Sequence, residues 1–173
     1  MKAKNAKKAL VSVVMGSDSD LPIMTETTKV LKEFGIDFEL ILTSAHRTPQ
    51  RTTKFAASAA GRGIKVIVVG AGAAAHLAGV IASQTTLPVI GIPINATALN
   101  GLDALLSTVQ MPGGVPVACT AIGKPGAINA AIYAIEIIAT SDAELAQKLV
   151  SYKEELARSV AEKSEKVKRE FQV

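Results

Sequence analysis

Four or five short apolar runs recur along the chain, separated by stretches with the spacing of helices. The runs are nearly continuous and rich in β-branched residues, which is typical of strands buried on both faces of a parallel sheet. They cover residues 9–15, 36–42, 65–70, 87–93 and 115–121. Between the first two runs, residues 23–34 have helical periodicity and stop at Gly35, a common helix terminator. Because strand and helix alternate, the pattern predicts a three-layer α/β domain with a central parallel sheet.

Two further helices are predicted after the last strand. Residues 126–139 are apolar almost all round, and such a helix is buried on more than one side, inside the fold or against another subunit. In so small a domain this pattern favours an oligomer. The sequence "SDAEL" then predicts the start of a charged helix, with Ser141 as its N-cap and Glu144 in the capping-box position. This last helix runs towards Phe171.

These elements predict one catalytic domain over residues 1–173. A chain of 173 residues is long enough for one well-filled core and short for two. Residues 1–8 are expected to form a basic, flexible N-terminus, and residues 141–173 a C-terminal helical extension.

The net charge of +4 at pH 7 suggests a nucleic-acid partner, but its distribution argues against one. Four of the nineteen basic residues lie among the first eight positions, and the other fifteen balance the fifteen acidic residues. No apolar run approaches the roughly 20 residues that a membrane span needs. The lone cysteine, Cys119, fits a reducing compartment and, within an apolar strand, a packing role. We therefore expect a cytoplasmic protein without nucleic-acid or membrane partners.

Residues that could perform chemistry gather in three connections. In open parallel sheets, ligands bind beyond the carboxyl ends of the strands. The connections after the first three predicted strands read "GSDSDLP", "TSAHRTP" and "GAGAAAH", and all are rich in small or polar residues. They contain both histidines of the chain, His46 and His76. We therefore expect the two imidazoles at one edge of the sheet.

The first connection could form an anion site. Ser17 and Ser19 offer hydroxyls and backbone N–H groups near a helix start. Plain capping by serine and aspartate explains the same residues equally well. Asp20 is expected either to cap the helix that opens at Pro22 or to accept hydrogen bonds from sugar hydroxyls.

The second connection combines a structural residue with a candidate ligand-binding residue. Thr48 before Pro49 is the pattern of a helix N-cap followed by a first-turn proline, so Thr48 is expected to be structural. Arg47, directly upstream, would be held where its planar guanidinium can bind a phosphate.

The third connection matches the dinucleotide-binding pattern G-x-G-x-x-A only formally. It follows the third strand, and no acidic residue lies about 20 positions further on. Gly70, Gly72 and the alanines are better explained as letting the backbone approach a flat ligand. Two histidines without a carboxylate or cysteine at ligand spacing are poor zinc ligands, so no metal site is predicted.

Taken together, the loops closely resemble the N5-carboxyaminoimidazole ribonucleotide mutase family of purine biosynthesis. The resemblance runs from about Leu10 to Ala139, in the family's order and spacing. It is carried by "VVMGSDSDLPIM", "SAHRTP", "GAGAAAHLAGVIA", "PVIGIP", "LDALLSTVQMPGGVPVA" and "AIGKPGAINAA". It implies a flavodoxin-like αβα sandwich, assembly as a homo-octamer, a small-molecule nucleotide substrate, and no cofactor or metal.

The resemblance also implies a role for each candidate site residue. His46 is the proton-transfer residue, and His76 lies across the same pocket. Asp20 takes the ribose hydroxyls. The substrate phosphate is held by Ser17, Ser19, Ser44 and Arg47, and the ring and migrating carboxylate lie against the backbone of Gly72, Ala73 and Ala74.

The chain departs from the family pattern at two of these motif positions. The family reads "GAGGAAH" where this chain has "GAGAAAH", so Ala73 replaces a glycine. Cys119 stands where a small residue such as glycine is usual. Neither change is expected to abolish activity.

The activity implied is conversion of N5-carboxyaminoimidazole ribonucleotide to 4-carboxy-5-aminoimidazole ribonucleotide through a trapped carbon dioxide molecule. The related carboxylase, which uses free carbon dioxide, is the main alternative. Arg47 in "SAHRTP" and His76 at the end of "AAAH" favour the mutase. A non-catalytic nucleotide-binding or flavin-binding module on the same fold is an alternative of another class.

Overall fold

The computed structural model describes residues 8–171, so the basic N-terminus predicted for residues 1–8 lies outside them except for Lys8. The chain divides into two compact units, the first ending at Ile137 and the second beginning at Ile138. We describe each unit by itself. Whether they act as the single catalytic domain expected from the sequence stays a prediction. No helix within residues 8–171 is long and apolar enough to cross a membrane.

The first unit is built on a five-stranded sheet in which every pairing is parallel. Its strands have the order β2-β1-β3-β4-β5, which is the order of flavodoxin-like doubly wound folds. In chain order they are β1 (Val11–Met15), β2 (Phe38–Leu42), β3 (Val66–Gly72), β4 (Val89–Ile94) and β5 (Ala118–Cys119). The predicted fold class, a flavodoxin-like αβα sandwich with a parallel sheet, is confirmed.

The buried strands explain why the apolar runs were so continuous. All five residues of β1 are buried, and so are the first five of β3, because helices cover both faces of the sheet. The two strands pair in register, with Val13 opposite Val68. β1 ends at Met15, which pairs with Gly70, and β3 continues to Gly72, so their neighbouring carboxyl ends open two of the loops that carry the candidate site residues.

The fifth predicted strand is much shorter than residues 115–121. Only Ala118 and Cys119 pair with β4, opposite Ile90 and Gly91. Pro116 has no backbone N–H and cannot donate to a ladder, and prolines are confined to strand ends and edges for that reason. The length predicted for this strand was therefore wrong, and the strand lies at the edge of the sheet beside β4.

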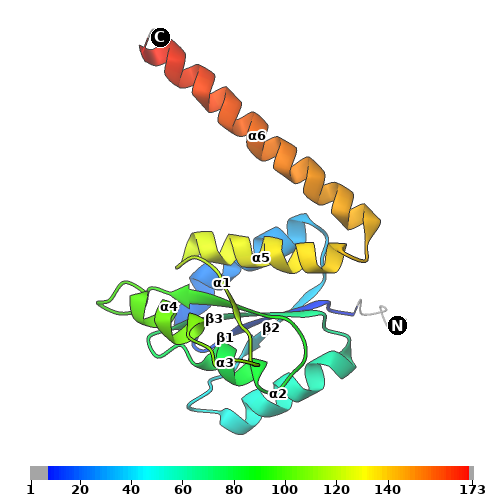
Figure 1. Ribbon diagram of the computed structural model, residues 1–173, viewed down its shortest axis with the longest axis vertical. Helices are drawn as coiled ribbons and strands as arrows, with labels where there is room; N and C mark the ends of the chain where they lie inside the picture. The colour runs from blue at the N-terminus through cyan, green and yellow to red at the C-terminus, as the bar shows by residue number, and fades with distance from the viewer. Residues whose placement is uncertain (1–7, 172–173) are drawn as a thin grey trace, which may run out of the picture. The chain divides into compact units, whose positions relative to one another are not determined.

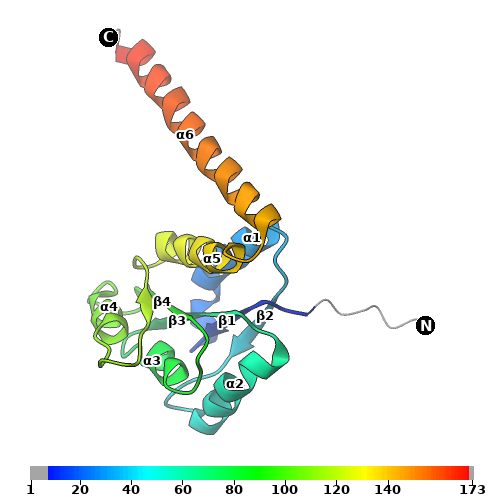
Figure 2. The ribbon, with the colours of Figure 1, turned by 45° about the vertical axis from the view of Figure 1, so that its right-hand side comes forward.

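Helices lie on both faces of the sheet (Figures 1 and 2). The helices α1 (Leu21–Glu33) and α5 (Lys124–Ala139) lie together on one face, where the Thr27 hydroxyl donates to the Ala127 carbonyl at 2.9 Å. On the other face lie α2 (Pro49–Arg62) and α3 (Leu77–Ala82). The remaining helix of this unit, α4, spans Leu102–Val109.

The helix α5 is buried along one side in this chain. Its buried residues are small, Ala127, Ala130, Ala131 and Ala134 among them, while Tyr133 is 44% exposed. Small side chains let α5 lie close to the sheet and to α1. The burial predicted for its other side would need a partner subunit and stays a prediction.

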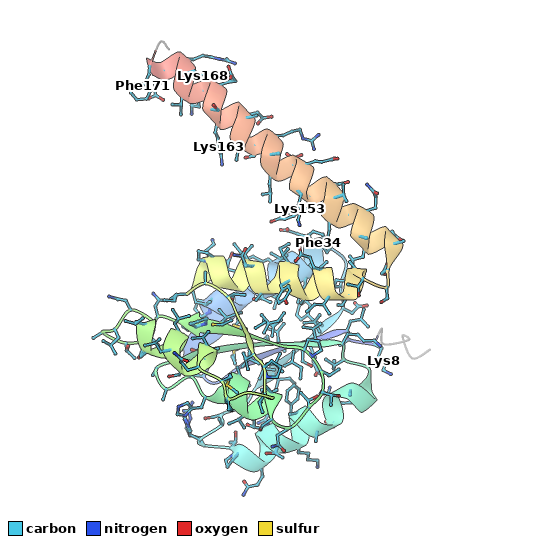
Figure 3. The ribbon with its side chains drawn as sticks, viewed as in Figure 1. Lys8, Phe34, Lys153, Lys163, Lys168 and Phe171 are labelled. Atoms are coloured by element: carbon cyan, nitrogen blue, oxygen red, sulfur yellow. The ribbon has the colours of Figure 1, made fainter. Side chains whose placement is uncertain are left out.

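The second unit consists mainly of α6 (Ala143–Phe171), whose start differs from the prediction. The N-cap is Asp142, because the Leu145 N–H donates to its Oδ1 at 3.0 Å. The Ser141 hydroxyl instead donates to the Ile138 carbonyl at 3.3 Å, so Ser141 is not the cap and no capping box forms with Glu144. Glu144 pairs with Lys148, one turn on, at 2.9 Å. Figure 3 shows the charged side chains that α6 carries along its length.

Candidate active site

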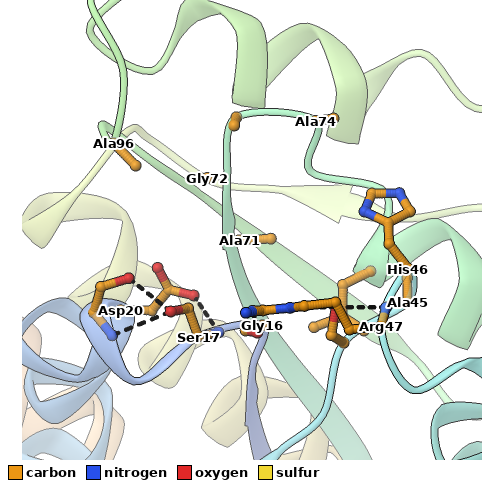
Figure 4. A pocket seen from close by; sticks show the side chains of 14 residues that line it. Gly16, Ser17, Asp20, Ala45, His46, Arg47, Ala71, Gly72, Ala74 and Ala96 are labelled. Atoms are coloured by element: carbon orange, nitrogen blue, oxygen red, sulfur yellow. Dashed lines mark hydrogen bonds between the residues drawn. The ribbon is translucent and has the colours of Figure 1, made fainter.

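The three connections predicted from the sequence meet at the carboxyl edge of β1, β2 and β3. They enclose a cavity of about 450 Å³, shown from close by in Figure 4. Nine of the ten predicted site residues line this cavity, and the tenth, His76, contacts one of them. The nine are Ser17, Ser19, Asp20, Ser44, His46, Arg47, Gly72, Ala73 and Ala74.

The loop after β1 is a compact turn held by its own side chains. The Ser17 N–H donates to Oδ2 of Asp20 at 3.0 Å, and the Ser19 N–H donates to the Ser17 hydroxyl at 3.4 Å. This reciprocal pattern is a capping box on a short 3₁₀ turn, η1 (Asp18–Asp20). The side chain of Asp20 makes no capping bond to α1, so that expected role was wrong.

The Asp20 carboxyl is buried beside the cavity, with 4% of the residue exposed. Its burial raises the pKa above the ordinary value of 3.8, because a charged carboxylate loses solvation there. Backbone N–H groups of Ser17 and Gly16 and the charge of Arg47 oppose that shift. The site therefore holds one desolvated carboxyl next to a guanidinium.

The loop after β2 is fixed by threonine hydroxyls. Thr48 is at the N-cap position of α2 and Pro49 follows it, as predicted. Its hydroxyl, however, turns away from the helix: it accepts from the Ser44 N–H at 3.0 Å and lies 3.1 Å from the Ser44 carbonyl. Thr43 and Thr52 are buried and bonded to each other at 2.9 Å. Thr48 is thus structural, because it sets the turn that carries Ser44, His46 and Arg47.

Arg47 connects the first two loops across the mouth of the site. Its Nη2 donates to the Gly16 carbonyl at 2.9 Å, and its Nε lies 3.5 Å from the Ser44 hydroxyl (Figure 4). A guanidinium has five N–H donors, so these contacts leave donors for a ligand. Arg47 is exposed, which keeps those donors accessible.

The two histidines contact each other directly. Nε2 of His46 lies 2.9 Å from Nδ1 of His76, and the rings meet edge to face with centroids 5.0 Å apart. His46 comes from the loop after β2, and His76 is the residue before α3. The two residues are thirty positions apart in sequence. They are brought together because β2 and β3, the strands that precede their loops, lie on either side of β1.

The loop after β3 brings backbone close to the cavity. A Cβ added at Gly72 would lie 2.6 Å from the Cβ of Ala96, so only glycine fits there without movement. Ala73 has a φ of +53°, in the left-handed region that favours glycine. The glycine that the resemblance leads us to expect at this position would adopt this region without strain, whereas Ala73 adopts it at a cost.

Sequence reasoning missed several residues that shape the cavity without carrying chemistry. These are Ala45, Leu77 and Ala96. Ala96 follows β4, and the rule that ligands bind at strand carboxyl ends would have found it if applied to the fourth strand. Cys119 is half-buried and is not among the lining residues, in keeping with a packing role. Residues 8–171 contain no group of three potential metal ligands.

A doubly wound parallel sheet with serines, an arginine and a histidine pair at its carboxyl edge defines a flavodoxin-like α/β enzyme. The chain belongs to the AIR carboxylase family, whose model matches residues 10–159. A relative from Pyrococcus horikoshii named N5-carboxyaminoimidazole ribonucleotide mutase is 52% identical over 162 residues, which are 94% of this chain and 90% of that protein. The resemblance seen in the motifs is confirmed.

Two further comparisons define the extent of the similarity. A crystal structure of Treponema denticola PurE matches this chain with a TM-score of 0.84 and 28% sequence identity. The match covers 92% of this chain and 99% of the Treponema denticola chain. A Saccharomyces cerevisiae protein named phosphoribosylaminoimidazole carboxylase is 47% identical over 160 residues, 92% of this chain but 28% of that protein. Relatives at similar identity thus carry both a mutase and a carboxylase name.

Proposed function

We propose that this enzyme converts N5-carboxyaminoimidazole ribonucleotide to 4-carboxy-5-aminoimidazole ribonucleotide in purine biosynthesis, with His46 as the proton relay. The observation that carries the proposal is the position of His46, hydrogen-bonded to His76 at 2.9 Å and lining one cavity with Arg47 and Asp20. An imidazole can donate and accept a proton near neutral pH, which this rearrangement requires.

The cavity residues divide into three binding regions. The substrate phosphate is assigned to Arg47 with the hydroxyls of Ser17, Ser19 and Ser44, because these donors surround the mouth of the cavity. The carboxylate of Asp20 is assigned to the ribose hydroxyls as an acceptor. The imidazole ring and the migrating carboxylate are assigned to the backbone of residues 72–74, where small side chains leave room for a flat ligand.

The chemistry needs two proton transfers, one to the exocyclic nitrogen and one from C4. The substrate carries its carboxyl group on the exocyclic nitrogen as a carbamate. Protonation of that nitrogen by His46 breaks the N–C bond and releases carbon dioxide, leaving an aminoimidazole whose C4 is nucleophilic. C4 attacks the trapped carbon dioxide, and His46 then removes the C4 proton to restore aromaticity. His46 gives one proton to the nitrogen and takes another from C4, so the imidazole ends in the protonation state in which it began.

Rate acceleration comes from two sources in this scheme. General acid–base catalysis by a positioned side chain contributes typically about 10²- to 10⁴-fold. Holding carbon dioxide against C4 replaces a bimolecular encounter with an intramolecular one and contributes further. His46 and Arg47 are exposed in the single chain, so retention of carbon dioxide requires the bound nucleotide or a neighbouring subunit to cover the opening.

The carboxylase alternative is tested by the source of the carboxyl group. The purified protein is given the carbamate nucleotide in isotopically labelled bicarbonate, and the C4-carboxylated product is analysed at short times. Direct migration predicts product that is almost unlabelled, with the uncarboxylated nucleotide a poor substrate. Rapid incorporation of label in the first turnovers would make the protein a carboxylase, even if His46 remained the proton relay.

Assembly is part of the same proposal. The apolar helix α5, with Tyr133 44% exposed, supports association into a homo-octamer. Light scattering at micromolar concentration tests this, and a monomeric mass would contradict it. A cytoplasmic location stays a prediction from the lone cysteine.

A further inference from the structure

A second cavity, of about 290 Å³, adjoins the first. Four residues line both cavities: Gly16, Ser17, Ser44 and Arg47. Three of these four are residues to which the phosphate is assigned above. A phosphate bound by Ser17, Ser44 and Arg47 would therefore lie at the junction of the two cavities, with the nucleoside on one side and the second cavity on the other.

The second cavity contains one further cationic side chain, Arg51. Arg51 lies on the first turn of α2, four positions after Arg47, and is exposed. With residues 8–171 it makes no hydrogen bond or ion pair. The hydroxyls of Thr43 and Thr48, on the same wall, are already bonded to each other at 3.2 Å. The Thr48 hydroxyl also accepts from the Ser44 N–H, and the Thr43 hydroxyl is bonded to that of Thr52. Arg51 is thus a wall residue whose donors are unused within the described part of the chain.

The charges around the two cavities leave a role for a second arginine. Asp18 lines the second cavity, and Asp20 lines the first. Counted with Arg47, these groups carry a formal charge of −1, and Arg51 brings the sum to zero. Arg51 therefore reduces the repulsion that a phosphate monoester meets, since that group carries a charge of about −1.5 to −2 at pH 7.

We propose that Arg51 is a second phosphate-binding arginine, which reaches the nucleotide phosphate from the adjoining cavity while Arg47 holds it from the first. The inference rests on the proposed function, because it places the phosphate of that substrate at the junction. A phosphate has three terminal oxygens, and a bidentate guanidinium occupies at most two of them. The third oxygen faces the second cavity, where it accepts a hydrogen bond from Arg51.

The test compares Arg51→Gln with Lys54→Gln in the full-length protein. Both changes remove one positive charge from an exposed position on α2, but Lys54 lines neither cavity. Each variant is titrated by calorimetry with the C4-carboxylated product nucleotide and with the matching nucleoside, which lacks the phosphate. We expect Arg51→Gln to weaken nucleotide binding roughly tenfold, the effect of one charge-assisted hydrogen bond at an accessible site.

The same variant should bind the nucleoside as the wild type does, and Lys54→Gln should change neither affinity. Thermal melts verify that both variants fold. Equal nucleotide affinity in the wild type and Arg51→Gln, or equal weakening in both variants, would overturn the role of Arg51 while leaving the proposed function standing. A wild-type protein that binds no nucleotide would overturn both.

Discussion

Nε2 of His46 and Nδ1 of His76 are 2.9 Å apart, so a single hydrogen lies between the two facing nitrogens. One ring must donate and the other must accept. If both rings were imidazolium, two N–H groups would point at each other and the bond would be lost. While the contact holds, one ring therefore acts as the donor and the other as the acceptor. This contact gives His46 a defined partner, which a lone exposed histidine would lack.

Replacing His46 with asparagine should separate binding from chemistry. His46 is exposed, so His46→Asn should keep the fold and the affinity for product nucleotide while turnover falls about 10²- to 10⁴-fold. Steady-state kinetics and calorimetry measure the two effects. The companion variant His76→Asn retains a side chain that can hydrogen-bond to His46 and should lose less. Near-normal turnover in His46→Asn would remove His46 from the mechanism, and would favour a non-catalytic nucleotide-binding module.

Arg47→Lys tests whether the planar guanidinium matters. Lysine keeps the charge but cannot contact the Gly16 carbonyl and the Ser44 hydroxyl in a fixed plane while also binding a phosphate in bidentate fashion. We expect nucleotide affinity to fall by about 1 to 3 kcal/mol, with little change in melting temperature. Unchanged affinity in calorimetric titrations would place the phosphate elsewhere.

Asp20→Asn should make the stability of the protein less dependent on pH and should weaken nucleotide binding. Burial raises the pKa of Asp20 above 3.8, so the folded chain binds this proton more tightly than the unfolded chain does. Over the pH range just above 3.8 the folded state thus holds more protons, and this group's contribution to stability decreases as pH rises. Denaturant unfolding at several pH values should show a flatter pH dependence in the variant, which lacks the titrating group.

The same variant should bind nucleotide about tenfold more weakly, because a neutral amide is a poorer acceptor for ribose hydroxyls than a carboxylate. Equal pH slopes for wild type and Asp20→Asn would show that the desolvated carboxyl does not titrate differently on folding. Loss of stability at neutral pH together with normal binding would make Asp20 a structural residue of η1 alone.

Ala73→Gly should stabilise the protein. Ala73 has a φ of +53°, and the left-handed region costs a residue with a Cβ about 1 kcal/mol relative to glycine. Ala57 is exposed in the middle of α2, where the same substitution should destabilise by about 0.5 to 1 kcal/mol. Thermal melts of the two variants should therefore shift in opposite directions. A decrease in both would mean that the strain at Ala73 is relieved by contacts of its methyl group.

The features that could be predicted from the sequence are those with a local cause. Buried parallel strands need apolar residues at nearly every position, so β1 and β3 were visible as continuous runs. The chirality and order of such a sheet place successive loops at one edge, which is why His46 and His76 could be expected near each other. Their direct contact could not be foreseen, because it depends on the register of the strands and on the conformation of two loops.

Two differences of detail concern choices between neighbouring groups of similar chemistry. Ser141 and Asp142 can both cap a helix, and the outcome depends on the residue at which α6 begins. Thr48 occupies an N-cap position, yet its hydroxyl makes no capping bond to α2 and instead accepts from the Ser44 N–H. Such competition is decided by three-dimensional geometry of a few tenths of an ångström, which a linear pattern does not contain.

The close approach of Gly72 and Ala96 has a consequence for engineering this enzyme. The two positions share one volume of space, since a Cβ at residue 72 would come within 2.6 Å of the Cβ at residue 96. A side chain placed at residue 72 alone would push against Ala96 and lie 3.2 Å from the Ile94 carbonyl, so the neighbouring backbone or Ala96 would have to move. Varied as a pair, with Ala96→Gly accompanying Gly72→Ala, the methyl group is moved from one wall of the cavity to the other. Changing which substrates fit against this wall of the cavity therefore requires residues 72 and 96 to be substituted together.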